Sequence, residues 1–464
     1  MIRKSLQPLL VAFVVLNAFA QVKLAPNGYY TWKNGVYDVN GDRHIFRGFN
    51  YGGFDENSHG LCYGPLNCGI NPDDFSIMAQ WGANIVRLPM NQTWWLNEEP
   101  VSGPWFSEAG LPANTTYRVM MDKLFELAKA AGLTVIADCH RAYTNGAIDK
   151  LTMATAETQA FWDAFSDQYK NDGQILFELL NEPRQITDDQ WMNGGNGYVG
   201  MSALYNTIRS NQAHNLILVA GNDWAYDIRG IYDYPLPENG YNILIVSHTY
   251  GNPNKTREYF DERFGFTHHG FTANNGVHYQ YPVIFTEFGY LEDPSDLAHT
   301  ASVINYAEEN DMSWIPWTWV GPYYKKHYMF DQKYNADPGR TPNNYGSLFR
   351  DSLAYLKNKP MPARHADAPY PEDTTHVNPI APQGLTKWSM DNRQLRFDAI
   401  SKGYVRIESF SLNGARTSII FEGAVPASRA IQFDQCKSLS GVYLIRLTYQ
   451  GRSQEKQFLF TERY

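Results

Sequence analysis

Short runs of apolar residues recur along the first three quarters of the chain, and each run ends in polar or aromatic residues. Eight such runs lie at 45–50, 85–90, 135–140, 175–182, 216–221, 243–248, 283–287 and 314–317. Their starts are roughly 30–50 residues apart, which leaves room for one helix and two loops. Nearly continuous apolar strands alternating with helices are typical of a parallel sheet covered on its outer face. The pattern therefore predicts an α/β fold, a (β/α)8 TIM barrel.

Helical patterns occupy the gaps between these runs. In segments 117–132 and 158–173, apolar residues recur at three- and four-residue spacing and a glycine follows the last turn. After residue 355 the pattern changes, because residues 359–384 are rich in proline and predict a linker. Residues 385–464 show short strands separated by turns and no convincing helix, which predicts a small all-β sandwich domain. The predicted catalytic barrel therefore spans residues 21–358.

The first 20 residues combine Arg3 and Lys4, an apolar stretch and the small-residue exit Ala18-Phe19-Ala20. This order predicts a secretory signal peptide cleaved after Ala20, and hence a secreted or cell-surface protein. A membrane anchor is the alternative, but the apolar stretch is short for a span. Export permits oxidation, so a Cys62–Cys68 disulfide is plausible, whereas Cys139 lies in a strand-like run and is expected to be a buried thiol.

Composition narrows the class of partner. Of the 464 residues 43% are hydrophobic, enough for a substantial core, and the 12 Trp and 31 Tyr suit stacking on flat apolar faces such as sugar rings. The formal net charge is −9 and no long basic run occurs, so a nucleic-acid partner is not expected. No cysteine spacing fits a zinc site, and no cofactor is implied.

The active site of a TIM barrel forms at the C-terminal ends of its strands. In this chain those ends carry acids, amides, imidazoles, an arginine and aromatics, namely Asn50, Arg87, His140, Asn181, Glu182, Asn222, His248, Tyr250, Glu287 and Trp317. The fourth and seventh strands lie nearly opposite each other across the mouth, so Glu182 and Glu287 are expected to face each other. A barrel that is only structural does not need this set of residues on one rim.

Two facing carboxylates fit the cleavage of a glycosidic bond with retention of configuration. In that chemistry Glu182 is the general acid/base, and burial beside a negative charge is expected to raise its pKa. Glu287 is the nucleophile and must stay ionised, and hydrogen bonds from Arg87 and Tyr250 would keep its pKa low.

The remaining candidates are supporting residues that bind substrate. Asn181, His140 and His248 suit sugar hydroxyls or the orientation of the glutamates, and Trp224 and Trp317 offer platforms for sugar rings. Ordinary structural interpretations stay open for single residues. Glu182 suits a helix start, the two histidines and Trp317 suit core packing, and Arg87 suits a brace inside the barrel.

The strand-end motifs together resemble glycoside hydrolase family 5. The matching pieces are GANIVRLPM, ADCHR, LLNEP, SHTYG, FTEFG and WIPWTW, in the order found in that family, across about residues 28–355. The resemblance implies that Glu182 is the acid/base and Glu287 the nucleophile. The opening RGFNYGGFDENSHGL is similar to endoglucanases that cleave β-1,4-glucan, while mannan- and xyloglucan-cleaving relatives share the catalytic set. A non-catalytic glycan-binding barrel is a further alternative, although such a protein is expected to lack one of the glutamates.

The C-terminal segment SLSGVYLIRLTYQGRSQEKQFLF is similar to sorting domains at the ends of exported proteins in some Gram-negative bacteria. That resemblance implies secretion machinery or the cell surface as a partner. A structural β-sandwich and a sugar-binding module are the alternatives. The expected protein is a monomer whose substrate is a β-linked polysaccharide, and whether it cuts internally or from chain ends stays open.

Overall fold

The computed structural model describes residues 22–55, 71–103, 105–144, 146–237, 240–250, 256–289, 294–319, 329–330 and 339–371 of the first part of the chain. Beyond residue 371 it describes the backbone of strands only. The predicted signal peptide, Cys62 and Cys68 lie outside the described residues. The chain divides into two compact units, residues 1–371 and residues 372–464. Among the described residues, no helix has the length and apolar character needed to cross a bilayer.

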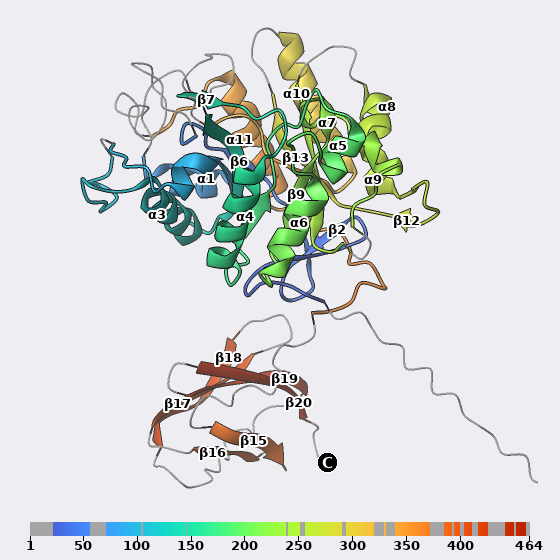
Figure 1. The fold of residues 1–464 in the computed structure, drawn as a ribbon. Coiled ribbons are helices and arrows are strands. Elements are labelled where there is room, and N and C mark those ends of the chain that lie inside the picture. The colour runs from blue at the N-terminus through green and yellow to red at the C-terminus, as the bar shows by residue number, and fades with distance from the viewer. Residues whose placement is uncertain are drawn as a thin grey trace, which may run out of the picture. The chain divides into compact units, whose positions relative to one another are not determined.

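The first unit is built on eight parallel strands that pair consecutively (Figure 1). They are β4 (Gly48–Asn50), β5 (Ile85–Asn91), β6 (Thr134–Thr144), β8 (Ile175–Glu178), β9 (Ile217–Ala220), β10 (Ile243–Thr249), β13 (Val283–Phe288) and β14 (Ser313–Trp314). A parallel bridge between Arg47 and Trp314 joins the first strand to the last. The predicted (β/α)8 barrel is therefore confirmed.

Alternation along the strands separates two apolar cores. Every second strand residue points inward, and residues such as Ile85, Ile136 and Leu244 form one buried cluster. Their sequence neighbours, such as Val86 and Val135, join the larger cluster that the surrounding helices cover. Strand β2 (Gly35–Tyr37), which pairs with β1 (Tyr30–Trp32) and β3 (Arg43–His44), contributes its central valine to the inner cluster. Through Val36, this N-terminal sheet therefore packs against the apolar cluster inside the barrel.

Helices alternate with the strands as the periodicity predicts. The longer ones are α1 (Asp74–Trp81), α3 (Tyr117–Ala130), α4 (Ala156–Tyr169), α6 (Met201–Ser210), α10 (Pro294–Glu309) and α11 (Asn344–Leu356). A capping box formed by Thr155 and Thr158 starts α4. The shorter elements are α2 (Gln92–Leu96), β7 (Ala147–Asp149), α5 (Asp188–Asn193), α7 (Asn222–Ala225), η2 (Arg229–Tyr232), α8 (Arg257–Phe260), η3 (Asp261–Gly265), α9 (Phe266–His269), β11 (Phe271–Thr272) and β12 (His278–Tyr279).

The fourth strand ends earlier than the apolar run predicts. Strand β8 stops at Glu178, so Glu182 lies four residues beyond it. The N–H of Asn181 still donates to the carbonyl of Cys139 on β6 at 3.1 Å, beyond the regular register, and Pro183 has no N–H with which to continue a ladder. Likewise β14 stops at Trp314, and Trp317 follows on an irregular segment. Glu182 and Trp317 therefore lie on loops that follow the two strands.

The first part of the predicted linker packs on the N-terminal sheet. Arg364 donates hydrogen bonds to the Tyr30 hydroxyl at 3.2 Å and to the carbonyl of Gly41, and the Tyr37 hydroxyl lies 2.5 Å from Nδ1 of His365. These contacts fix the end of the first unit to strands β1 and β2.

The second unit consists of antiparallel strands. Strands β15 (Leu385–Asp391) and β16 (Gln394–Ala399) form a pair. Strands β18 (Arg416–Val425), β17 (Gly403–Phe410), β19 (Gly441–Tyr449) and β20 (Arg452–Phe460) form a sheet in that order. The predicted sandwich and sorting function of this unit stay predictions.

Candidate active site

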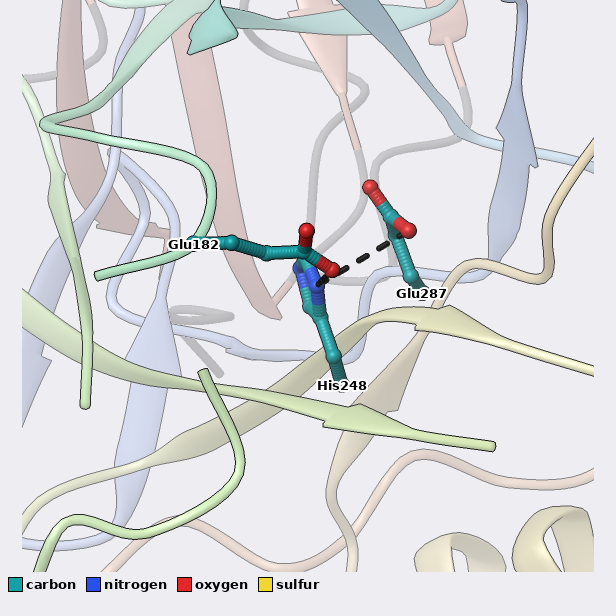
Figure 2. Close-up of side chains that lie close together, drawn as sticks. All are labelled: Glu182, His248 and Glu287. Atoms are coloured by element: carbon teal, nitrogen blue, oxygen red, sulfur yellow. Dashed lines mark hydrogen bonds and ion pairs between the residues drawn. The ribbon is translucent and has the colours of Figure 1, made fainter. Parts of the chain in front are cut away.

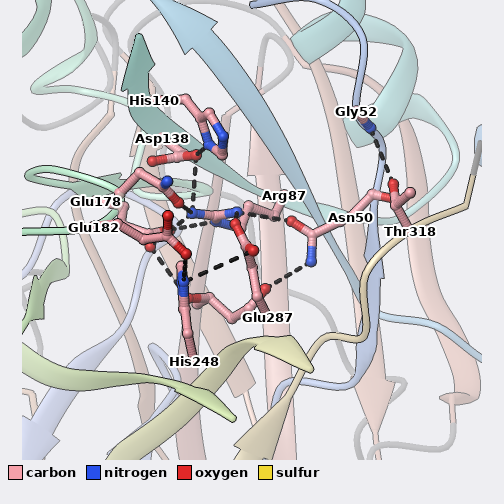
Figure 3. A network of polar contacts seen from close by, with 12 residues as sticks. Asn50, Gly52, Arg87, Asp138, His140, Glu178, Glu182, His248, Glu287 and Thr318 are labelled. Carbon is pink, nitrogen blue, oxygen red and sulfur yellow. Dashed lines mark hydrogen bonds and ion pairs between the residues drawn. The ribbon is translucent and has the colours of Figure 1, made fainter. Parts of the chain in front are cut away.

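Arg87 is the centre of a buried polar cluster in the barrel mouth (Figure 3). Its guanidinium is fully buried and pairs with Glu178 through Nε at 2.6 Å and through Nη2 at 3.0 Å. Its other contacts are Asp138 at 2.9 Å, Asn181 at 2.8 Å, Asn50 at 2.9 Å and Glu287 at 2.8 Å. Burial works to lower the pKa of Arg87, but the surrounding carboxylates raise it well above its usual value. This arginine therefore carries a permanent charge that orients the groups around it.

Glu287 lies near the C-terminal end of β13 and has the contacts expected of an ionised carboxylate. Its Oε1 accepts from Arg87 at 2.8 Å and its Oε2 accepts from the Tyr250 hydroxyl at 2.7 Å. Burial works to raise the pKa of Glu287, but the charges of His248 and Arg87 outweigh it and lower that pKa. Both hydrogen bonds agree with the sequence-based expectation.

Glu182 lies on the loop after β8 and is also largely buried. Its Oε1 lies 3.0 Å from Nδ1 of His248, and its Oε2 accepts from Nζ of Lys150 at 3.0 Å. The expectation of a raised pKa is wrong for this arrangement. Burial does work to raise the pKa of Glu182, but the hydrogen bond with His248 and the charge of Lys150 lower it well below its ordinary value.

The two glutamates meet as the barrel geometry predicts (Figure 2). One carboxylate oxygen of Glu182, one of Glu287 and a ring nitrogen of His248 all lie within 4.8 Å of one another. Parallel pairing brings His248 and Glu287 together, because His248 on β10 is in register with Glu287 on β13. The carboxyl groups are therefore close enough to act on one bond.

His248 connects Glu182 to the interior of the barrel. Its Nε2 lies 3.0 Å from the Thr286 hydroxyl, which donates to Glu178 Oε1 at 3.1 Å. A hydroxyl that donates to Glu178 accepts from Nε2–H, so a proton resides on Nε2. Nδ1 then faces Oε1 of Glu182 at 3.0 Å.

His140 and Trp317 form a stacked pair across the site. Their ring centroids are 5.8 Å apart with planes at 16°. Nδ1 of His140 lies 2.6 Å from Asp138. Burial works to lower the pKa of His140, but Asp138 and Asp55 outweigh it and raise that pKa. Trp317 is half-buried, so part of the residue is accessible to solvent.

Asn181 has one group left over for a ligand. Its Oδ1 accepts from Arg87 at 2.8 Å, which fixes the amide orientation. Its buried Nδ2 has no hydrogen-bond partner among the residues that the structure describes. Unsatisfied buried donors are rare, and one beside two catalytic-type carboxylates suits a ligand oxygen.

Trp224 lies beside the loop that carries Glu182. Its backbone N–H donates to the carbonyl of Pro183 at 3.0 Å, and 46% of the residue is exposed. It lines a hollow of about 560 Å³ together with residues of α5, α7 and η2. Three successive residues, Asp223 to Ala225, adopt left-handed φ values of 55–61°. Such strain in non-glycine residues is concentrated at functional sites.

Several neighbours of the site were not predicted from the sequence. Asp138 precedes His140 by two residues on β6, so strand alternation gives a signal that both side chains face inward. Thr286 precedes Glu287 and has no comparable signal. Lys150 follows β7 in a loop, and nothing in its sequence context indicates contact with Glu182.

Metal binding has a single candidate group in the described part of the chain, formed by Glu182, His248 and Glu287. Each carboxylate already accepts from a cationic side chain, Lys150 or Arg87. Nearby positive charge opposes a divalent cation. The sequence-based expectation that no metal is needed stays a prediction.

The model of the cellulase family, glycosyl hydrolase family 5, matches residues 46–321. This chain belongs to glycosyl hydrolase family 5. The matched region includes all eight barrel strands and the polar cluster around Arg87. The family resemblance predicted from the strand-end motifs is therefore confirmed for the barrel.

Relatives and solved structures agree with this assignment. An endoglucanase from Paenibacillus polymyxa is 26% identical over 255 residues, covering 50% of this chain and 63% of that protein. The sequence match thus spans less than two thirds of that relative. An endocellulase from Pyrococcus horikoshii in complex with cellotetraose has a TM-score of 0.57 at 17% identity, covering 73% of this chain and 100% of that one. A β-glucanase from Saccharophagus degradans has a TM-score of 0.52 at 21% identity, covering 73% and 97%. These structures show the same fold.

Proposed function

We propose that this protein is a retaining endo-β-1,4-glucanase in which Glu287 is the nucleophile and Glu182 the general acid/base. The observation that carries the proposal is that one carboxylate oxygen of Glu182 lies within 4.8 Å of one carboxylate oxygen of Glu287. Retaining enzymes hold their carboxyl groups about 5 Å apart, whereas inverting enzymes leave about 6.5–9.5 Å for a water molecule. The short separation supports double displacement.

In the first step Glu287 attacks the anomeric carbon of the bound sugar. The bond from that carbon to the glycosidic oxygen breaks, and protonated Glu182 gives its proton to the leaving oxygen. Arg87 and Tyr250 hold Glu287 ionised and aimed. The free amide N–H of Asn181 donates to the hydroxyl next to the reacting carbon, a contact that strengthens in the transition state.

In the second step water replaces the departed sugar. Glu182, now ionised, removes a proton from water as the oxygen attacks the anomeric carbon, and the bond to Glu287 breaks. His248 and Lys150 both favour the ionised form of Glu182, which suits this half of the cycle.

Similar proteins and two tryptophans of this chain indicate the class of substrate. The relatives of this chain include an endoglucanase and a cellulase, and similar solved structures contain cellotetraose. Exposed Trp224, in the hollow beside α5, and half-buried Trp317, beside His140, each offer an aromatic face that suits stacking on a β-linked glucose ring. We therefore favour β-glucan, with β-mannan and xyloglucan as alternatives within the same chemistry.

The ends of the chain extend the proposal to location. Residues 1–20 have the charge, apolar stretch and small-residue exit of a signal peptide, which supports secretion or display on the cell surface. The β-rich second unit is proposed to engage the export machinery or the cell surface.

Reducing-sugar release and product configuration test the function. Wild-type protein is expected to release reducing ends from carboxymethylcellulose, whereas Glu287→Ala is expected to release almost none. Proton NMR of the first product from cellotetraose should show the β-anomer before mutarotation. Equal release by both proteins would remove Glu287 from the mechanism, and an initial α-anomer would exclude retention. Parallel assays on mannan, xyloglucan and lichenan identify the substrate.

A further inference from the structure

Lys150 contacts Glu182 in a way that the proposed chemistry does not use. Its Nζ lies 3.0 Å from Glu182 Oε2, while Oε1 of the same carboxylate is engaged by His248. The carboxylate is nearly buried, and the lysine side chain is 36% exposed. Both oxygens of the proposed acid therefore have cationic or hydrogen-bonding partners before any substrate arrives.

The backbone beneath Lys150 is fixed to the loop of Glu182. Arg184 donates to the carbonyls of Leu151 at 2.8 Å and Lys150, and to the carbonyl of Glu182 at 3.2 Å. The backbone N–H of Arg184 also donates to the carbonyl of Thr152 at 3.0 Å. The backbone of the lysine thus keeps its place beside the acid, while its flexible four-carbon side chain is partly exposed and reaches Glu182 by its ammonium group.

The observed contact conflicts with proton donation. A general acid must carry a proton and present an oxygen to the glycosidic oxygen. The Lys150 ammonium group at 3.0 Å favours the ionised carboxylate. It also occupies Oε2, the carboxylate oxygen that does not contact His248. Of the other charged groups, Glu287 opposes ionisation of Glu182, while His248 supports it. Among these groups, Lys150 is the exposed one that a ligand can displace.

We propose that Lys150 is a movable positioning residue for Glu182, paired with it in the free enzyme and displaced by the sugar that binds there. Withdrawal of the ammonium lets Glu182 take a proton from solvent and donate it to the leaving oxygen. After the leaving sugar departs, Lys150 returns and stabilises the ionised base. This inference rests on the proposed function and adds to it a step in which substrate itself loads the acid.

Kinetics of Lys150→Met against the control Lys170→Met test the proposal. Lys170 pairs with Asp167 and is 35% exposed, so it matches Lys150 in burial, but it is the residue that caps the C-terminal end of α4. The term kcat/KM reports the free enzyme and kcat the complex. At pH above both carboxyl pKa values, the productive fraction depends on the pKa of Glu182. Lys150→Met should therefore raise kcat/KM for cellotetraose about tenfold, the effect of about one pKa unit, with kcat nearly unchanged.

Two further substrates and variants separate this role from a structural one. Dinitrophenyl β-cellobioside has a leaving group that departs without a proton, so its kcat/KM should be the same in wild type and Lys150→Met. Lys150→Arg keeps the positive charge and should keep the wild-type pH profile. Equal changes in kcat and kcat/KM, the same gain with the dinitrophenyl substrate, or no gain at all would each overturn the proposal.

A titration that does not depend on turnover separates this proposal from the proposed function. The ¹³C carboxyl signal of Glu182, assigned with Glu182→Gln, should titrate at higher pH in Lys150→Met than in wild type. The effect of bound substrate is measured in proteins that carry Glu287→Gln. Saturating cellotetraose should raise the titration midpoint of Glu182 when Lys150 is present and leave it unchanged when Lys150→Met is added. Identical midpoints in the free proteins would contradict the contact, even if the wild type hydrolyses β-glucan. Failure of the wild type to hydrolyse any β-glucan or β-mannan would instead contradict the proposed function.

Discussion

Arg87→Met removes the cation on which the buried cluster depends. Methionine fills much of the arginine volume but leaves Glu178, Asp138 and Glu287 in the barrel without their shared partner. Removing one member of a buried ion pair typically costs about 3–5 kcal/mol, because the remaining charge is unpaired. Glu178 is the most affected, since it is fully buried and loses both hydrogen bonds to the guanidinium.

The loss should depend on pH with a defined sign. Burial already raises the pKa of Glu178 in the wild type, where Arg87 works to lower it. Loss of Arg87 is therefore expected to raise the folded pKa further above the unfolded pKa of about 4.3. Stability from such a group is complete below the unfolded pKa and is lost as pH rises through the folded pKa. One proton held in the folded state alone gives at most about 2.7 kcal/mol of further destabilisation relative to the wild type between pH 5 and pH 7, at 1.36 kcal/mol per unit.

Urea unfolding at pH 5, 6 and 7 measures this effect. Wild type, Arg87→Met and the control Arg350→Met, whose exposed pair with Asp351 should contribute less than about 1 kcal/mol, are compared. Adding Glu178→Gln to Arg87→Met should restore part of the stability and remove much of the pH dependence. A deficit that is constant from pH 5 to pH 7, or a double variant as unstable as the single one, would refute the reasoning.

Three further predictions concern the groups around the reacting bond. Tyr250→Phe removes a hydrogen bond to Glu287 that is worth about 1.5–3 kcal/mol for a charged acceptor. The pKa of Glu287 should therefore rise, and kcat/KM at acidic pH should fall about 10–100-fold. The pH profile of kcat/KM measures this effect, and an unchanged acid side of the profile would contradict it. Asn181→Ala should lower kcat on cellotetraose at least about 10-fold with a smaller change in KM, and an effect on KM alone would contradict a transition-state contact. Trp224→Ala should raise KM for long β-glucan, because it removes an aromatic contribution of about 0.5–1.5 kcal/mol to binding. Cleavage of dinitrophenyl β-cellobioside should be unchanged. Equal losses on both substrates would contradict a role of Trp224 as a platform for a sugar ring.

The barrel and its facing carboxylates were predictable because they follow from local patterns. Apolar runs predict the strands, and parallel topology places all strand ends on one rim. The register of β10 with β13 then brings His248 beside Glu287. The expected hydrogen bonds from Arg87 and Tyr250 to Glu287 are present. Arg87 lies within β5, and Tyr250 directly follows β10, the strand that pairs with β13.

The electrostatic state of Glu182 was not predictable in the same way. Burial alone raises a carboxyl pKa, and that part of the expectation holds. The opposing charge comes from Lys150, which follows the hairpin formed by β6 and β7, an addition to the basic barrel unit. The end of β8 was also misplaced, because an apolar run does not show where neighbouring strands stop pairing. Interactions set by loop placement have no periodic signal in the sequence.

Covalent trapping tests the central claim most directly. A 2-deoxy-2-fluoro β-cellobioside with a dinitrophenyl leaving group slows the second displacement more than the first, so a retaining enzyme accumulates its glycosyl intermediate. Proteolysis and mass spectrometry should locate one fluorocellobiosyl group on Glu287, with slow release in buffer. No adduct despite hydrolysis of β-glucan, or an adduct on Glu182 in place of Glu287, would contradict the assignment of the two glutamates.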